Sequence, residues 1–274
     1  MTYLEPQRGM VPFRELAVVG IDDTERRMRS IAIGSFDGVH LGHRDVVRGC
    51  DTVLTFAPHP LRVLRPESAP ALLTSHNQKI AKLAALGVRE VVTIPFDTHW
   101  AKQSAADFVD KILVGILNAR EISVGFNFRY GAHGYGTPEK LQQDRRFRTR
   151  VVSPVTVGST VVSSTAIRML VQQGDVRGAT RLLGAPFAQP ATIRDDHTVI
   201  FPIDLAVPSA KTYICDIGGV VARLSFDGEP HLVDTADPVG PNEQETMVTF
   251  LSESTSAVAQ WAYAAGGAAA PLLR

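Results

Sequence analysis

The chain has 274 residues, of which 45% are hydrophobic and 20% charged, with 28 basic and 28 acidic side chains. This composition excludes a disordered or fibrous protein, and the length suits two compact domains. Cys50 and Cys215 are too few for a disulfide framework or a four-cysteine zinc site, which predicts a reducing, cytoplasmic setting.

Membrane insertion and secretion are also not expected. No apolar run reaches the roughly 18 residues that a membrane-spanning helix needs. Acidic residues such as Glu5, Glu15 and Asp22 interrupt the first 30 positions, which argues against a signal peptide.

The net charge of zero hides a division along the chain. Residues 1–186 carry 24 basic and 17 acidic side chains, whereas residues 187–274 carry 4 basic and 11 acidic ones. Such an asymmetry indicates separate modules. We therefore predict two domains, 1–186 and 187–274, and expect anionic ligands on the first.

Short apolar strands alternate with helical patterns in the first domain. Strands are predicted at 30–33, 52–56, 90–94, 121–124, 151–155 and 160–162, and helices at 41–48, 75–86, 104–117, 165–173, 175–183 and from Pro138. In helix 75–86, Ile80, Leu83, Ala84 and Leu86 are expected to face the core. The alternation predicts a parallel sheet with helices on both faces, which binds ligands beyond the carboxyl ends of its strands.

The pattern changes after residue 186. Strands are predicted at 199–207, 212–217, 220–226, 231–233 and 247–250, with Gly and Pro between them and no crossover helices. This is typical of a small antiparallel barrel or sandwich. A single Ala-rich helix is predicted at 254–265.

The strongest motif is GSFDGVHLGH at 34–43, directly between the first strand and the first helix. His40 and His43 are three positions apart, so they share one face of a helical turn. Gly34 and Gly38 permit close backbone approach to a ligand, and the start of a helix favours phosphate. No Gly-Lys-Ser/Thr follows, so the stretch is not a Walker A loop. It is not a Rossmann dinucleotide fingerprint either.

This stretch resembles the HxGH signature of the nucleotidyltransferase superfamily. Its longer form, GxFDGVHxGH, is similar to the bacterial FAD synthetases, the bifunctional riboflavin kinase/FMN adenylyltransferases. Four further segments follow in the family's order: TFAPHP at 55–60, GFNFRYG at 125–131, SSTAIR at 163–168 and LLGAPF at 182–187. The resemblance implies a Rossmann-like α/β nucleotidyltransferase domain, followed by a smaller antiparallel β-barrel. It also implies transfer of AMP from ATP to FMN, giving FAD and pyrophosphate.

The resemblance assigns roles to residues of the motifs. It implies catalytic His40, His43 and Arg168; ATP-binding Gly34, Phe36, Asp37, Gly38, Asn127, Ser163, Ser164 and Thr165; and flavin-binding Phe56, Pro58, His59 and Arg129. Mg²⁺ is expected to accompany the triphosphate, and Asp37 either helps to orient it or simply forms the turn. Arg129 either contacts the ligand or closes its loop.

The second module departs from the family. A riboflavin kinase opens with a glycine-rich loop and a Phe-Pro-Thr-Ala-Asn segment, whereas 187–201 contains no glycine and FPIDL stands at 201–205. The Thr and Asn ligands are therefore missing. We expect a degenerate kinase-like barrel without riboflavin kinase activity.

Two alternatives remain open. The segment between His43 and Thr52 is shorter than usual for the family, which favours another phosphorylated acceptor. The altered second module favours a non-catalytic regulatory protein that binds flavin or nucleotide. The arginines at 145–150 are interpreted as a solvated helix end, so no nucleic-acid or membrane partner is expected beside the small-molecule substrates. The oligomeric state is left open.

Overall fold

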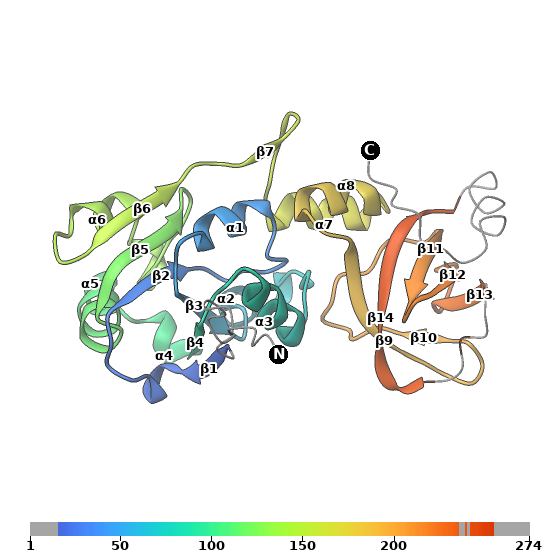
Figure 1. Cartoon of the computed structure of the whole chain (residues 1–274), viewed down its shortest axis with the longest axis horizontal. Helices are drawn as coiled ribbons and strands as arrows, with labels where there is room; N and C mark the ends of the chain where they lie inside the picture. Colours follow the sequence, from blue (N-terminus) through green and yellow to red (C-terminus); the bar gives the residue numbers. More distant parts are fainter. Residues whose placement is uncertain (1–15, 236–238, 240–241, 255–274) are drawn as a thin grey trace, which may run out of the picture.

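The computed structural model describes residues 16–235, 239 and 242–254, which form two regions, each built on a six-stranded sheet (Figure 1). The first sheet is parallel throughout, in the order β1-β4-β3-β2-β5-β6. Its strands are β1 Ala17–Gly20, β2 Arg29–Ile33, β3 Thr52–Ala57, β4 Glu90–Pro95, β5 Ala119–Gly125 and β6 Arg148–Val152. We call residues 16–162 the parallel-sheet region.

Helices cover both faces of this sheet. They are α1 Leu41–Val47, α2 Pro60–Leu64, α3 His76–Ala85, α4 Thr98–Ala101, α5 Ala105–Asp107, a π-helix at Phe108–Ile116, and α6 Pro138–Gln143, with short 3₁₀ turns at Ile21–Asp23, Pro66–Ser68 and Ala132–Gly134. Ile31 and Ile33 of β2 belong to one buried cluster and Ala32 to another. Successive side chains of a strand point to opposite faces, so β2 is buried on both sides and its sequence is continuously apolar.

Two helices differ from the prediction. In α3 only Leu83 is buried, whereas Ala84 and Leu86 are exposed, because the helix packs along a narrower stripe than its sequence suggested. The helix predicted at 104–117 begins as expected, with the Ser104 hydroxyl accepting the Asp107 N–H at 3.0 Å. It then continues as a π-helix, and the Leu117 N–H donates to the Ile112 carbonyl, five residues back.

The strand predicted at 151–155 lies earlier, as β6 at Arg148–Val152. Arg145 and Arg146 follow α6 and are exposed, as expected of a solvated helix end, whereas Arg148 and Arg150 belong to β6. Arg150 reaches from this edge strand to α1, where its guanidinium donates to the carbonyls of Asp45, Val46 and Arg48. Those carbonyls lie at the end of α1, where intrahelical partners run out.

A hairpin and two helices lead to the second sheet. They are β7 Thr156–Val157, β8 Thr160–Val161, α7 Ser164–Gln172 and α8 Val176–Leu183. The helices lie between the two sheets in Figure 1. Ile167 and Leu183 share a buried cluster with Phe187 and Tyr213 of the second sheet. The hydrophobic core is thus continuous across residue 186, and the domain boundary there stays a prediction.

The second sheet is antiparallel, in the order β10-β9-β14-β11-β12-β13. Its strands are β9 Phe187–Ile193, β10 Val199–Ile200, β11 Thr212–Ile217, β12 Val220–Ser225, β13 His231–Thr235 and β14 Asn242–Glu253. The two edge strands, β10 and β13, are joined by hydrogen bonds at their ends. The Val199 N–H donates to the Pro230 carbonyl at 2.7 Å, and the Leu232 N–H donates to the His197 carbonyl at 3.0 Å. This closure confirms the predicted barrel, and we call residues 187–254 the barrel. The helix predicted at 254–265 lies outside the described residues beyond Ser254.

The barrel begins with a strand that was not predicted. β9 contains Pro190, and proline cannot donate to a ladder of hydrogen bonds. β10 pairs only with Thr192 and Ile193, so Pro190 lies on a stretch of β9 that pairs with β14 alone. The strand predicted at 199–207 is shorter in the structure, where β10 contains only Val199 and Ile200.

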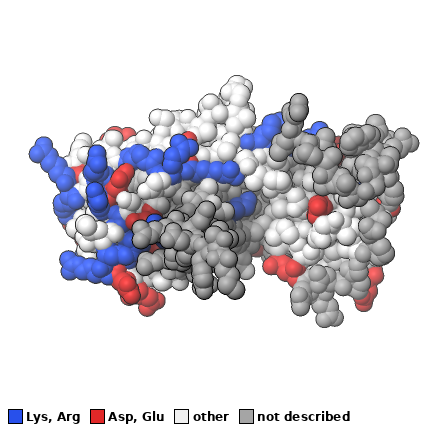
Figure 2. Space-filling model, in the orientation of Figure 1, with Lys and Arg blue, Asp and Glu red and all other residues white. Residues whose placement is uncertain are grey.

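The charge division of the sequence is visible on the surface. Figure 2 shows Lys and Arg side chains gathered over the parallel-sheet region, whereas the charged side chains in view on the barrel are mainly acidic. Among the residues that the structure describes, no helix is long and apolar enough to cross a membrane.

Candidate active site

A pocket of about 430 Å³ opens at the carboxyl ends of the central parallel strands. Ile33 ends β2, Phe56 lies near the end of β3, and Gly125 ends β5; all three line it. The chain builds the sheet outward from β2 through β3 and β4, then returns to add β5 on the other side of β2. The pocket therefore lies at the point where the strand order reverses, which is where open α/β sheets bind ligands.

The glycine-rich loop enters the pocket with an unusual backbone. Phe36, Gly38 and Val39 all have positive φ angles, of 52°, 87° and 46°. At Gly38 a Cβ would also meet the Leu73 side chain at 3.1 Å. Positive φ is rare for β-branched residues, and such strain concentrates at functional sites.

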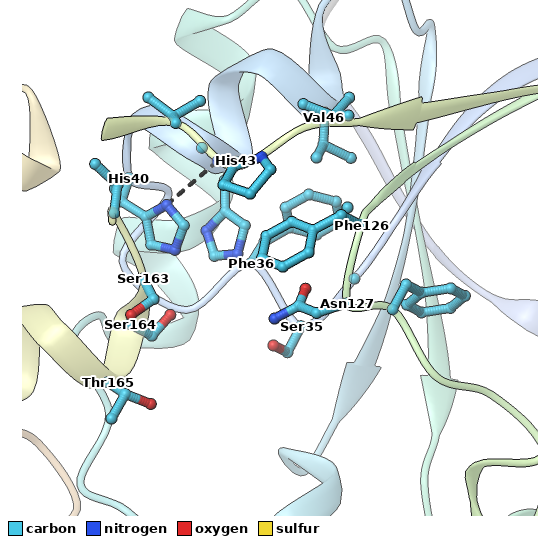
Figure 3. A pocket seen from close by; sticks show the side chains of 18 of the residues that line it. Ser35, Phe36, His40, His43, Val46, Phe126, Asn127, Ser163, Ser164 and Thr165 are labelled. Atoms are coloured by element: carbon cyan, nitrogen blue, oxygen red, sulfur yellow. Dashed lines mark hydrogen bonds between the residues drawn. The ribbon is translucent and has the colours of Figure 1, made fainter. Parts of the chain in front are cut away.

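The two histidines of this loop lie against each other (Figure 3). Their rings stack with centroids 3.6 Å apart and planes 14° apart, and Phe36 meets the His43 ring edge-on at 5.2 Å. The Nδ1 atom of His40 caps α1 by accepting the His43 N–H at 3.3 Å. Because Nδ1 is an acceptor, the proton of the neutral His40 ring is on Nε2, where it can be donated to a ligand.

Both rings are neutral near pH 7. Burial lowers the pKa of His40 to about 4, and the positive charge of Arg168 adds to the effect. Burial also lowers the pKa of His43 well below its ordinary value, helped by His40 and by the Lys79 ammonium. The Nδ1 atom of His43 is buried and has no hydrogen-bond partner among the described residues.

The start of α7 forms a second wall of the pocket. The Ser163 hydroxyl accepts the Ala166 N–H at 3.1 Å, and the Ser164 hydroxyl donates to the Asp37 carbonyl at 2.9 Å. Ser163, Ser164 and Thr165 all line the pocket, with Ser163 and Ser164 close to His40 (Figure 3). The N–H groups of a first helical turn have no partner within the helix, so this end favours an anion.

Asp37 and Arg168 form an ion pair behind the loop, 2.7 Å apart and almost excluded from solvent. Arg168 also donates from Nε to the Ala71 carbonyl at 2.8 Å. The other carboxylate oxygen of Asp37 accepts the N–H groups of Leu73 and Thr74. Asp37, Gly38 and Arg168 therefore support the loop from outside the set of residues that line the pocket.

The remaining predicted residues divide between two strand ends. Phe56 and His59 line the pocket after β3, whereas Pro58, which follows a cis peptide bond, is exposed and does not. The His59 Nδ1 accepts the Leu61 N–H at 3.3 Å at the start of α2. Burial lowers the pKa of His59.

The loop after β5 completes the pocket. Asn127 and Arg129 line it together with Phe126 and Phe128, and Asn127 faces the histidines (Figure 3). Arg129 is exposed and donates to the Phe128 carbonyl at 2.9 Å. Gly34 and Phe36 also line the pocket. Eleven of the fifteen predicted residues therefore share it: Gly34, Phe36, His40, His43, Phe56, His59, Asn127, Arg129, Ser163, Ser164 and Thr165.

Lys79 of α3 lies beside the pocket and was not predicted from the sequence. Its Nζ donates to the Thr55 hydroxyl at 3.3 Å and to the carbonyl of Ser35, a pocket residue, at 3.5 Å. Burial lowers the pKa of this ammonium. Nothing in the spacing of the helix singled it out, because lysines are ordinary on amphipathic helices. The apolar wall formed by Val155, Val161 and Val162 was also missed.

Comparisons with known proteins agree with the family resemblance of the sequence motifs. Residues 22–166 match the protein family described as FAD synthetase. The chain is 33% identical over 219 residues to a bifunctional riboflavin kinase/FMN adenylyltransferase of Listeria monocytogenes, covering 74% of this chain and 69% of the relative. A protein of Bacillus subtilis with the same description is 34% identical over 224 residues, covering 75% and 70%.

One solved structure is similar over nearly the whole chain. It is titled a macrolide-efflux protein from Streptococcus pneumoniae, with a TM-score of 0.77 and 21% identity, covering 92% of this chain and 97% of that one. At this identity the likeness shows the fold alone.

Proposed function

Since the chain belongs to the FAD synthetase family and is an FMN adenylyltransferase, we propose that it joins ATP and FMN into FAD in the pocket described above, and does not phosphorylate riboflavin. The observation that carries this proposal is the meeting of the HxGH loop and the start of α7 at one pocket. Two groups of hydrogen-bond donors thus face a space at the reversal point of a parallel sheet.

We propose that the ATP phosphates lie between these two donor groups. His40 offers Nε2–H, and the first turn of α7 offers backbone N–H groups with the Thr165 hydroxyl. Donors fixed in advance at a site of developing charge stabilise a transition state without reorganising. The neutral ring of His43 lines the pocket beside His40, with its Nδ1 atom buried and unpaired among the described residues.

The flavin would enter from the strand ends of β3 and β5, beside Phe56, His59 and Phe128. An oxygen of the FMN phosphate attacks the α-phosphorus of ATP, forming one P–O bond as the bond to the β-phosphate breaks. Pyrophosphate leaves with the electron pair, and hydrogen bonds donated by His40 and His43 would stabilise part of its growing charge. Positioning and charge stabilisation dominate phosphoryl-transfer chemistry of this kind, so no covalent enzyme intermediate is required.

We propose that Mg²⁺ enters with ATP as part of the substrate. The described residues contain no group of three or more His, Cys, Asp or Glu side chains that could hold a metal. Asp37, the one predicted candidate, has both carboxylate oxygens engaged by Arg168, Leu73 and Thr74. Mg²⁺ commonly binds through substrate phosphates and waters, which fits this arrangement.

The proposed loss of riboflavin kinase activity is supported by the start of the barrel. Residues 187–193 form β9, whose backbone pairs with β14 and β10, and so does not present a glycine-rich cradle for phosphate. Phe201 stacks on Phe226 inside the barrel, and Asp204 lies against Arg62 of the parallel-sheet region. The segment at 201–205 therefore has packing contacts of its own.

The experiment that tests the function is incubation of the protein with ATP, Mg²⁺ and either FMN or riboflavin, followed by chromatography of the flavins. FAD from FMN, and no FMN from riboflavin, is the expected result. Turnover only with another phosphorylated acceptor would favour a different transferase, and flavin binding without turnover would favour a regulator. A cytoplasmic location and the absence of nucleic-acid partners stay predictions.

A further inference from the structure

A four-residue segment, 71–74, joins the barrel to the parallel-sheet region. Leu72 pairs with Leu205 of the barrel. The Leu72 N–H donates to the Asp204 carbonyl and the Ala206 N–H donates to the Leu72 carbonyl, each at 2.8 Å. We call residues 71–74 the linking segment.

One barrel side chain secures this contact. Gln189 of β9 is fully buried, and its Nε2 donates to the Ala206 carbonyl at 2.8 Å and to the Leu73 carbonyl at 3.4 Å. The Oε1 atom of the same amide is buried and has no hydrogen-bond partner among the described residues, so the two bonds donated by Nε2 are what offset the cost of burying this side chain. Gln189 thereby holds the linking segment and the barrel loop at 204–206 to each other.

The linking segment also makes hydrogen bonds to the HxGH loop of the parallel-sheet region. The N–H groups of Leu73 and Thr74 donate to the Asp37 carboxylate at 2.8 and 3.3 Å, and the Gly38 N–H donates to the Thr74 hydroxyl at 3.1 Å. Arg168 donates to the Ala71 carbonyl and to Asp37. A chain of direct contacts therefore runs from Gln189 through the linking segment to the loop that carries His40.

We propose that Gln189 is a positioning residue for adenylyl transfer, through which the barrel holds the HxGH loop in its active conformation; this rests on the function proposed above. The loop needs outside support, because Phe36 and Val39 have positive φ angles that persist only where surrounding contacts over-determine them. The barrel thus serves the transferase site, and the FPIDL segment at 201–205 contributes to this support through Asp204 and Leu205.

The test compares two substitutions of buried hydrogen-bonding side chains in the full-length protein. Gln189→Leu removes the amide that holds the linking segment. Tyr213→Phe is the control, because it removes a hydrogen bond of the same barrel, from the Tyr213 hydroxyl to the Ser209 carbonyl, that does not touch the linking segment. For each variant, Tm, kcat and both KM values are measured, with hydrogen exchange of segments containing residues 37–38 and 71–74.

A small displacement of catalytic groups lowers rate strongly, so Gln189→Leu is expected to lower kcat about tenfold with a smaller change in KM. Its exchange at both segments should rise, while Tyr213→Phe changes Tm alone. Equal kcat in the two variants, together with unchanged exchange at 37–38, would overturn the proposal. If Gln189→Leu does not fold, Thr74→Val removes the next contact in the chain and must show the same kcat loss. If the parent protein makes no FAD, the proposed function fails, whereas the exchange data still decide whether Gln189 orders the loop.

Discussion

The rings of His40 and His43 lie face to face, 3.6 Å apart, while the His40 ring accepts the backbone N–H of His43. Two protonated imidazoles could not occupy this arrangement without strong repulsion, which is consistent with the lowered pKa of each ring. We therefore propose that both rings meet the substrate uncharged, and that the charge of the bound phosphates would favour their protonation.

This arrangement predicts a loss of stability in mild acid. The pKa of His40 is about 4 when folded and near 6.5 when unfolded, so below pH 6.5 the unfolded state binds a proton that the folded state does not. The free energy of unfolding should therefore fall as pH drops from 6.5 toward 4, with His40 alone contributing a loss of roughly 2 kcal/mol at pH 5. Urea unfolding at pH 7 and at pH 5 measures this change in the free energy of unfolding. The same loss in His40→Asn would show that another group is responsible.

Substitution of His40 separates capping from catalysis. Asparagine accepts the hydrogen bond of a helix N-cap well, so His40→Asn should retain stability, whereas His40→Ala should lose about 1 kcal/mol. Both should lose adenylyl transfer, because neither supplies the Nε2–H donor. Thermal unfolding and FAD formation are measured for the pair. Substantial turnover in His40→Asn would remove this histidine from the mechanism.

His43→Ala should abolish adenylyl transfer while the fold stays intact. The His43 ring packs between His40 and Phe36 at the pocket, and only its backbone N–H takes part in the α1 cap. Circular dichroism checks the fold, and steady-state kinetics check the activity. Unchanged turnover would refute the site assignment.

Because Asp37 and Arg168 form a buried ion pair, we expect the substitution Asp37→Asn to lower the stability of the protein strongly. Asp37→Asn keeps an oxygen for the N–H groups of Leu73 and Thr74 but leaves the Arg168 guanidinium without its counter-charge. Breaking a buried pair from one side costs about 3 kcal/mol or more, so Tm should fall clearly. If Asp37 instead served mainly as a metal ligand, Tm would change little and the Mg²⁺ dependence of the rate would shift.

Lys79 is predicted to attract the anionic substrates. Lys79→Met removes a half-buried ammonium whose hydrogen bonds go to the neutral oxygens of Ser35 and Thr55, so the KM for ATP or FMN should rise several-fold. Lys111→Met is the matched control, since that exposed lysine pairs with Asp107 away from the pocket. Equal KM values in the two variants would show that Lys79 is structural.

Local sequence signals predicted much of the fold. The helices predicted at 75–86, 165–173 and 175–183 correspond to α3, α7 and α8. Ser75 begins α3 in a capping box with Gln78, and Gly174 and Gly184, with positive φ, follow α7 and α8. The failures required tertiary information. The π-helical turns at 108–116, and the placement of Arg150 against the end of α1, depend on packing between distant segments.

For the candidate site too, local motifs predicted some residues, whereas others depend on tertiary contacts. His40, Ser163 and Asn127 were predicted from the motifs, because each lies just after a strand or at the start of a helix. Lys79 and Gln189 were not predicted, since each reaches its partners through contacts between elements far apart in the sequence. The pairing of Asp37 with Arg168, 131 residues apart, likewise has no local signature.

The most direct test of the account follows the phosphorus atoms. ATP labelled at the α-phosphate or the γ-phosphate is incubated with FMN, Mg²⁺ and the full-length protein, and the products are separated. We expect the α-label to appear in FAD and the γ-label in pyrophosphate, in equal amounts, and riboflavin to accept neither label. Transfer of the γ-label to riboflavin, or no FAD from FMN, would contradict it.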